Sequence, residues 1–181
     1  MRASHLNKAL AVSGGCKLDW VDKYQDYDSP EKREEFFRSH VVDLHHDSML
    51  FSGGLDPFVL HEIESSFVQG NFIACILLCQ LVAEHSLAHC FVLSEHESVC
   101  TKGFAKLIAK AREVNLIDET MESKLTALRL MRNPHVHPRF GDGKGAIIHR
   151  VIEQGFHYNE LPVHDGIEAI KILGDYINHN S

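Results

Sequence analysis

Apolar side chains recur every three or four residues in the second half of the chain, which is the spacing of one helix face. The pattern predicts helices over residues 104–113, from Asp118 to about 132, and over 164–179. Their apolar stripes comprise Phe104, Leu107, Ile108 and Ala111; Met121, Leu125 and Leu128; and Ile167, Ile170, Leu173 and Ile177. Arg132 occupies the next position of the middle stripe, so we expect its side chain to point toward the core.

The first half of the chain carries signals that begin and end helices. Ser29 as an N-cap, followed by Pro30 and acidic residues, predicts a helix over about 30–45, and Asp56-Pro57 predicts another that runs to Gln69. After a hinge at 70–71, residues 71–93 are apolar almost all round at first, as in the central helix of a bundle. The glycine-rich, then β-prone segment 141–156 predicts an irregular loop in which a short strand can form. These elements predict an all-α bundle of five or six helices.

Composition narrows the class of protein. With 181 residues, 44% of them hydrophobic, the chain is long enough to bury one hydrophobic core. A formal net charge of -7 argues against a protein that coats nucleic acid by neutralising phosphates, although it is compatible with a local basic site. The odd number of cysteines and the absence of Cys-x-x-Cys spacing predict reduced thiols and a cytoplasmic protein. The longest apolar run, 72–83, is shorter than the roughly 20 residues that cross a bilayer, so we expect no membrane association.

One short stretch, Arg132 to His137 ("RNPHVH"), concentrates polar chemistry at the end of a predicted amphipathic helix. An arginine followed a few residues later by a histidine recurs elsewhere in this chain of 14 histidines, so the spacing alone carries little weight. The context is more specific, because Asn133 follows the arginine directly and a long apolar helix with the acidic break "LVAEHSLAH" precedes it.

This arrangement resembles the HEPN superfamily of helical domains, whose signature is an arginine, often a polar residue such as asparagine, and a histidine after four to six positions. Residues 69–91 resemble the family's buried helix that ends in glutamate, 104–137 its following helix pair, and 161–177 its closing helix. The resemblance covers roughly 56–179. We therefore divide the chain into an N-terminal extension with one helix, 1–55, and a HEPN-like bundle, 56–181.

The resemblance implies a metal-independent endoribonuclease without a cofactor, a homodimer with two motifs facing one cleft, and a setting in toxin or antiviral defence. His137 would act as general base or acid on the 2′-hydroxyl attack, and Arg132 would stabilise charge on the phosphoryl oxygens. Asn133 would orient backbone or phosphate, and His135 is a rival to His137. Glu84 would orient a histidine or pair with Arg132; the alternative is a buried acid paired with any nearby base.

Helix geometry constrains this motif. On an unbroken helix Arg132 and His137 lie about 140° apart, whereas Arg132 and His135 share a face. Pro134 lacks an amide hydrogen and clashes with the preceding turn, so we expect a bend there that brings Arg132 and His137 together, unless a second chain supplies one of them. The alternative reading is a cationic helix C-terminus with solvated histidines.

Other charged residues suggest how RNA would be held. Lys102, Lys106 and Lys110 recur at fourfold spacing, and with Arg139 they form the predicted RNA-binding set; the alternative is a solvated helix face. Arg139 stands where some family toxins carry a tyrosine that a nucleotidylating antitoxin modifies, so we do not expect that control. Histidine and cysteine spacings of the zinc type are missing, and no metal site is predicted. The alternative functions are a non-catalytic module that binds a nucleotide or a protein partner, and a purely structural helical domain; a protein partner or an antitoxin is the partner considered besides RNA and a second copy.

Overall fold

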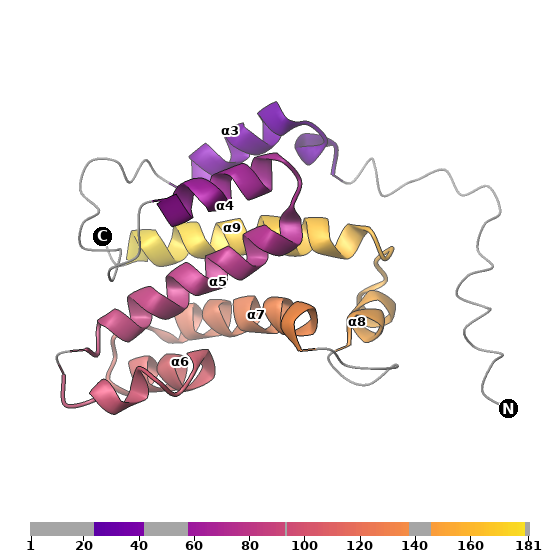
Figure 1. Ribbon diagram of the computed structural model, residues 1–181. Coiled ribbons are helices and arrows are strands. Elements are labelled where there is room, and N and C mark those ends of the chain that lie inside the picture. Colours follow the sequence, from indigo (N-terminus) through magenta and orange to yellow (C-terminus); the bar gives the residue numbers. More distant parts are fainter. Residues whose placement is uncertain (1–23, 42–57, 93, 138–145, 180–181) are drawn as a thin grey trace, which may run out of the picture.

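The computed structural model describes residues 24–41, 58–92, 94–137 and 146–179, and these segments are all-helical. Seven α-helices and two short 3₁₀ turns, Gln25–Tyr27 and Glu97–Val99, occur in them, and none of the described segments forms a strand (Figure 1). The helices are α3 (Pro30–His40), α4 (Phe58–Val68), α5 (Phe72–His89), α6 (Phe104–Glu113), α7 (Glu119–Val136), α8 (Ile147–Gln154) and α9 (Glu160–His179). The predicted all-α class is confirmed.

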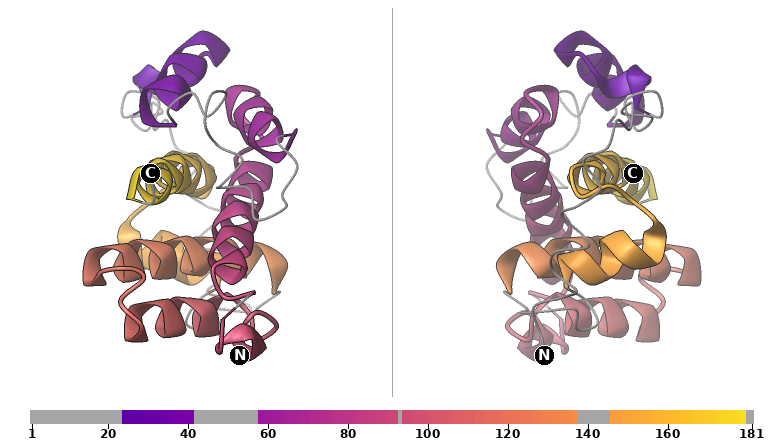
Figure 2. Two further views of the ribbon diagram at one scale, coloured as in Figure 1. Left: turned by 90° about the vertical axis from the view of Figure 1, so that its left-hand side faces the viewer. Right: turned by 90° about the vertical axis from the view of Figure 1, so that its right-hand side faces the viewer.

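Helix α5 is the hub of the bundle. It packs against α4, α6, α7 and α9, while α3 lies across α4 and α9 (Figures 1 and 2). By length and composition α5 is the one described helix that could span a membrane. Its neighbours on several sides give it the position of a core helix.

Helix ends follow the sequence signals. The Ser29 side chain accepts from the Lys32 amide at 3.3 Å, and Asp118 accepts from the Met121 amide at 2.7 Å, so both act as N-caps. Gly155 ends α8 in the left-handed conformation with φ of 68°, which a residue with a Cβ adopts only under strain.

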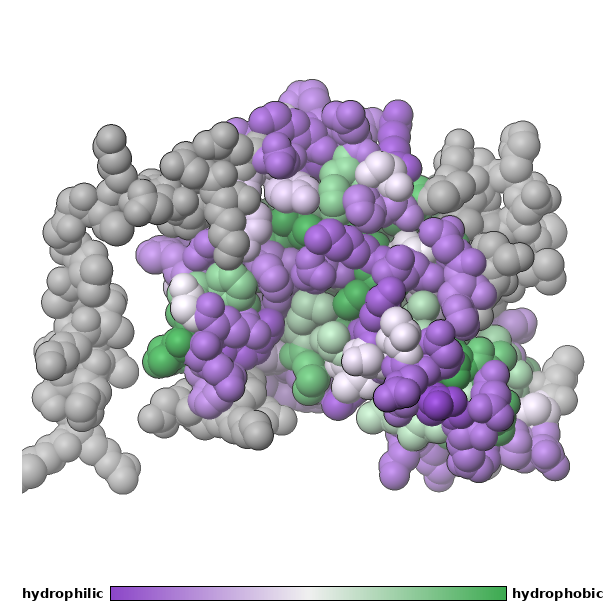
Figure 3. All heavy atoms as spheres, turned by 180° about the vertical axis from the view of Figure 1, so that it is seen from behind, coloured by the Kyte–Doolittle hydropathy of each residue, from purple (hydrophilic) through white to green (hydrophobic). Residues whose placement is uncertain are grey.

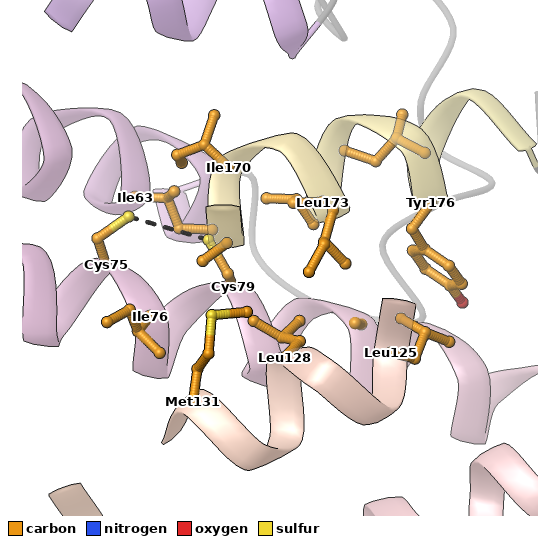
Figure 4. Packing of buried hydrophobic residues seen from close by; sticks show 14 of the residues in the cluster. Ile63, Cys75, Ile76, Cys79, Leu125, Leu128, Met131, Ile170, Leu173 and Tyr176 are labelled. Atoms are coloured by element: carbon orange, nitrogen blue, oxygen red, sulfur yellow. Dashed lines mark hydrogen bonds between the residues drawn. The ribbon is translucent and has the colours of Figure 1, made fainter. Parts of the chain in front are cut away.

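The core lies where α5, α7 and α9 meet. Figure 4 shows Met131 and Leu128 of α7 directed toward Ile76 and Cys79 of α5, with Leu173 of α9 on the other side. Four of the five cysteines are described, and all four are free thiols. Cys16 lies outside the described residues, as does the predicted domain boundary at 55/56.

Small residues let the helices approach closely. A Cβ at Gly174 of α9 would meet the carbonyl carbon of His40, the last residue of α3, at 3.0 Å. A Cβ at Gly166 would meet the Phe72 ring at 2.7 Å, so the first turns of α5 and α9 are in direct contact. These two contacts fix α9 against α3 and α5.

Two sequence predictions need correction. The β-prone part of segment 141–156 forms helix α8, because its apolar residues also recur at helical spacing and Arg150 is anchored to α9. Helix α7 does not end at Pro134 but continues to Val136, with the His137 amide donating to the Asn133 carbonyl at 2.9 Å. Proline is tolerated there because it lies in the last turn, where only one helical hydrogen bond is lost.

Candidate functional site

The C-terminal end of α7, helix α8 and the first turns of α9 come together at one end of the bundle (Figure 1). We call this end the histidine cluster and define it by Arg132, His135, Arg150, His164 and Asp165. The last four are linked by contacts or by their charges, and Arg132 is one turn from His135 on α7.

Asp165 is the centre of the cluster. Its carboxylate is fully buried and receives two hydrogen bonds from Arg150, Nη1 to Oδ2 at 2.5 Å and Nη2 to Oδ1 at 2.8 Å. The Arg150 side chain is itself 15% exposed. This bidentate ion pair fastens α8 to α9, because a buried carboxylate is stable only when paired.

His164 lies beside the same carboxylate. Its Nδ1 is 3.3 Å from Oδ1 of Asp165, and the Phe156 ring lies 4.8 Å from its imidazole ring, centroid to centroid. The side chain remains 34% exposed. His164 is therefore positioned on two sides but open to solvent.

His135 faces the cluster from α7. Its Nε2 is shielded from solvent and has no hydrogen-bond partner in the described part of the chain. Burial lowers the pKa of His135, Asp165 acts in the opposite direction, and the charge of Arg150 lowers it further. The ring is consequently neutral at neutral pH.

Arg132, like Arg129 one turn earlier on α7, has no carboxylate partner among the described residues. It is partly exposed, and no hydrogen bond or ion pair holds its guanidinium among the described residues. By contrast, Arg38, Arg112 and Arg150 each pair with a carboxylate. The motif thus contains a cation that the described bundle does not neutralise.

Asn133 and His137 take other positions. With its amide turned so that both groups are satisfied, Asn133 accepts from Nη1 of Arg129 at 3.3 Å and donates to the Arg129 carbonyl at 3.2 Å. His137 is exposed and caps α7. Because α7 stays helical up to Val136, ideal helix geometry places positions 132 and 137 about 140° apart around its axis.

Glu84 lies in a different place. It accepts from Nε2 of Gln80 at 3.0 Å and forms no ion pair with Arg132 in the segments that the structure describes. It borders a hollow of about 450 Å³ along the C-terminal half of α5, lined by Leu81, Glu84, His85, Ala88, His89, Val92 and Cys100. Within the described segments no three histidine, cysteine, aspartate or glutamate side chains are grouped so that they could hold a metal ion.

The predicted basic stripe is partly neutralised. Lys110 donates to Glu113 at 2.7 Å, and Lys102 precedes the first residue of α6. Lys102 and Lys106 are exposed, whereas Arg139 lies outside the described residues. Two cations of the predicted set are therefore available on this side of the bundle.

Exposed apolar side chains occur on α7 and α8, which meet at this end of the bundle. On α7 they are Leu130 and Val136, and on α8 they are Ile148 and Ile152. Figure 3 shows how apolar side chains interrupt the polar surface on one face of the molecule. Helices α7 and α8 thus both present apolar surface to solvent.

Sequence reasoning missed Arg150, His164 and Asp165. A signal was present, because Asp165 stands between Leu161 and Ala169 at fourfold spacing on the buried face of α9. A carboxylate on a buried stripe requires a cation. The sequence did not indicate which cation, since Arg150 belongs to a segment expected to be irregular.

We compared the chain with family models, curated proteins and solved structures, and none of the three comparisons found a match. What is established is an all-helical domain of seven described helices, without a family assignment.

Proposed function

We propose that this chain is a metal-independent endoribonuclease that acts as a homodimer. The observation that carries the proposal is the guanidinium of Arg132, which has no hydrogen bond or ion pair within the described segments, whereas Arg150 at the same end of the bundle is paired with Asp165. Together with His137 it reproduces the HEPN-like signature. A structural arginine would be expected to hold an acid or a helix carbonyl, and Arg132 holds neither within the described segments.

The course of α7 supports the proposed homodimer. Ideal helix geometry separates positions 132 and 137 by about 140°, so a site built from two chains would bring Arg132 and His137 to one phosphate more readily than a site within one chain. A two-fold axis near the end of α7 would place each arginine opposite the partner's histidine. The exposed Leu130, Val136, Ile148 and Ile152 supply apolar surface that a second copy would cover.

The proposed reaction needs acid–base chemistry and charge stabilisation. One imidazole takes the proton of the 2′-hydroxyl, whose oxygen attacks the adjacent phosphorus, and the bond to the 5′-oxygen breaks. A second imidazole protonates that oxygen, and the products are a 2′,3′-cyclic phosphate and a 5′-hydroxyl. His137 supplies one imidazole, and Arg132 stabilises the phosphoryl charge in the transition state.

The other predicted residues have supporting roles in this proposal. Lys102 and Lys106 would contact RNA phosphates, and Asn133 would fix the backbone and Arg129 near the motif. His135 is the alternative to His137 because it shares a face with Arg132. A toxin or antiviral setting, with a protein antitoxin as partner, belongs to the same proposal.

The test is cleavage of a mixed RNA in EDTA by the wild-type protein and by Arg132→Ala and His137→Ala. Matched controls are Arg38→Ala, an exposed arginine of α3, and His61→Ala, an exposed histidine of α4. We expect cyclic phosphate ends from the wild type and both controls, and loss of at least about 100-fold in each motif variant. A folded wild-type dimer that leaves every RNA intact would contradict the proposal.

A mixing experiment tests the two-chain site. An equimolar mixture of Arg132→Ala and His137→Ala subunits contains heterodimers in which one of two sites keeps both residues. We expect cleavage to return in the mixture. No recovery, with heterodimers verified by native mass spectrometry, would mean that both residues act within one chain.

The hollow beside α5 favours a second candidate function. A non-catalytic module that binds a nucleotide or a protein partner needs one preformed site per chain, and this hollow combines apolar walls with Glu84, His85 and His89. Titration with ATP, followed by the NMR signals of His85 and His89, tests it. Saturable shifts in a protein that does not cleave RNA would favour this function over the ribonuclease.

A further inference from the structure

Asp165 contacts a histidine as well as an arginine, and this second contact has chemical consequences. Arg150 holds the carboxylate from α8, and His164 presents Nδ1 to Oδ1 at 3.3 Å. An ionised carboxylate only accepts hydrogen bonds, so the contact is favourable when Nδ1 carries the proton. The lone pair then lies on Nε2. This Nδ1–H tautomer is the one in which a histidine can act as a base through Nε2.

The Nε2 atom of His164 is accessible. It makes no hydrogen bond in the described part of the chain and it is not buried. The Nε2 atom of His135, by contrast, is buried without a hydrogen-bond partner among the described residues. Of the two imidazoles in the cluster, His164 is therefore the one whose base nitrogen a substrate can reach.

The location agrees with the ribonuclease site. His135 is close enough to Asp165 and Arg150 for both charges to act on it, and Arg132 is the next residue along the same face of α7. Arg132 and His135 of α7 thus lie at the same end of the bundle as Asp165 and His164 of α9. Arg150 is fully engaged by Asp165, so Arg132 is the cation at this end that can meet a phosphate.

We propose that His164 is a further catalytic residue, the general base that takes the 2′-hydroxyl proton, and that Asp165 is its positioning residue. This inference rests on the proposed ribonuclease function. The proton moves from the 2′-oxygen to Nε2 of His164 as the 2′-oxygen forms its bond to phosphorus. The bond to the 5′-oxygen then breaks, and that oxygen takes a proton from His137 of the second copy, so atoms and charge balance. Arg150 keeps the Asp165 carboxylate in place through its two hydrogen bonds.

A structural role for the same residues makes different predictions. If Asp165 serves only to hold Arg150, the His164 tautomer is unconstrained, and His164→Gln alters neither the rate nor its pH dependence. His149 is a suitable control, because this α8 histidine at the same end of the molecule faces Glu153, at 3.4 Å, and not Asp165. Charged groups that face His164 from the packed helices are Asp165 and, through it, Arg150.

The first experiment is a long-range ¹H–¹⁵N NMR spectrum of the full chain at alkaline pH, which identifies the tautomer of each histidine without any substrate. We expect His164 as the Nδ1–H tautomer, and this signal should change in Asp165→Asn. His164→Gln leaves the ion pair intact and identifies the His164 signal by its disappearance, so the wild-type tautomer can be read even where Asp165→Asn fails to fold. Observation of the Nε2–H tautomer for His164 in the wild type overturns the proposal.

The second experiment is steady-state cleavage across pH. We expect His164→Gln to lower kcat by about 10²–10⁴-fold with KM within threefold, and to flatten the acid limb of the pH profile, while His149→Gln leaves both unchanged. Wild-type rates in His164→Gln, in a protein whose His137→Ala variant is inactive, refute the role of His164 and leave the ribonuclease function standing. A wild type that cleaves no RNA refutes both.

Discussion

The ion pair between Arg150 and Asp165 offers the sharpest test of the fold around the site. Arg150→Met keeps most of the apolar stem but leaves the buried carboxylate of Asp165 without its cation and with His164 as its one remaining hydrogen-bonding neighbour among the described residues. Removing one partner of a buried pair typically costs about 3–5 kcal/mol. At pH 7 an aspartate can instead take up a proton at a cost of about 4 kcal/mol, and this cost sets an upper limit on the expected loss of stability. We therefore expect the free energy of unfolding to fall by about 3–4 kcal/mol.

Acidification provides an internal check on that magnitude. Proton uptake by an aspartate becomes easier by about 1.4 kcal/mol for each unit by which the pH falls. The difference in unfolding free energy between wild type and Arg150→Met should therefore shrink to about 2 kcal/mol at pH 5.5. Urea titrations followed by circular dichroism give the free energies by linear extrapolation. A variant that also replaces Asp165 with leucine should recover most of the loss, because no buried charge remains.

The control is the exposed ion pair between Lys124 and Asp175, whose side chains are 38% and 50% exposed. Lys124→Met should cost no more than about 1 kcal/mol, since water and salt screen such pairs. If Arg150→Met costs no more than this control, or if the difference does not change with pH, the view of Asp165 as a buried carboxylate that depends on Arg150 is wrong.

Three further variants test packing and protonation. Gly174→Ala places a methyl group against the backbone carbonyl of His40, and we expect a loss of about 1–3 kcal/mol in urea unfolding. Tyr176→Phe removes a buried hydroxyl whose pKa burial raises to about 12 and which donates to Ser86 at 3.2 Å; thermal unfolding should report a loss of about 0.5–1.5 kcal/mol. Burial lowers the pKa of His135 from 6.5, so its contribution to stability is complete above about pH 6.5 and is lost as the pH falls toward the folded value. His135→Gln should therefore make stability less dependent on pH between 7.5 and 5.5, as measured by urea unfolding at both pH values.

The sequence predicted those parts of the fold in which local signals and tertiary packing agree. The stripes of α6, α7 and α9 are buried as their spacing indicates, with Leu107, Leu125 and Leu173 fully inside. The caps at Ser29 and Asp118 form the expected hydrogen bonds. In each case the residue type has one dominant physical preference, and the fold satisfies it.

Helix α8 shows why the remainder of the fold was missed. Isoleucine and valine favour strands when only local propensity is weighed, and the glycines before Ile147 suggested a loop. What decides the conformation is a contact between residues 15 positions apart, Arg150 and Asp165. Propensity cannot report such a pairing, since it depends on where α9 passes.

The candidate site was predicted in one half only. The motif from Arg132 to His137 stands out because its residues are adjacent in the sequence. His164 and Asp165 belong to another helix, and their relation to α7 arises only when α9 packs against it. Glu84, which sequence order placed near Arg132, instead borders the hollow along α5.

Arg132 and Arg150 are the same type of residue, but they differ in whether a carboxylate binds them. Both lie at one end of the bundle and both are partly buried, yet Arg150 gives two hydrogen bonds to a buried acid and Arg132 gives none among the described residues. An arginine that is already bound to a carboxylate must lose that pair before it can bind a phosphate, whereas an unbound one need not. The available cation therefore belongs to the motif, and the paired cation fixes the helix beside it. This difference is the physical reason for proposing that Arg132 binds the phosphate and that Arg150 supports the site.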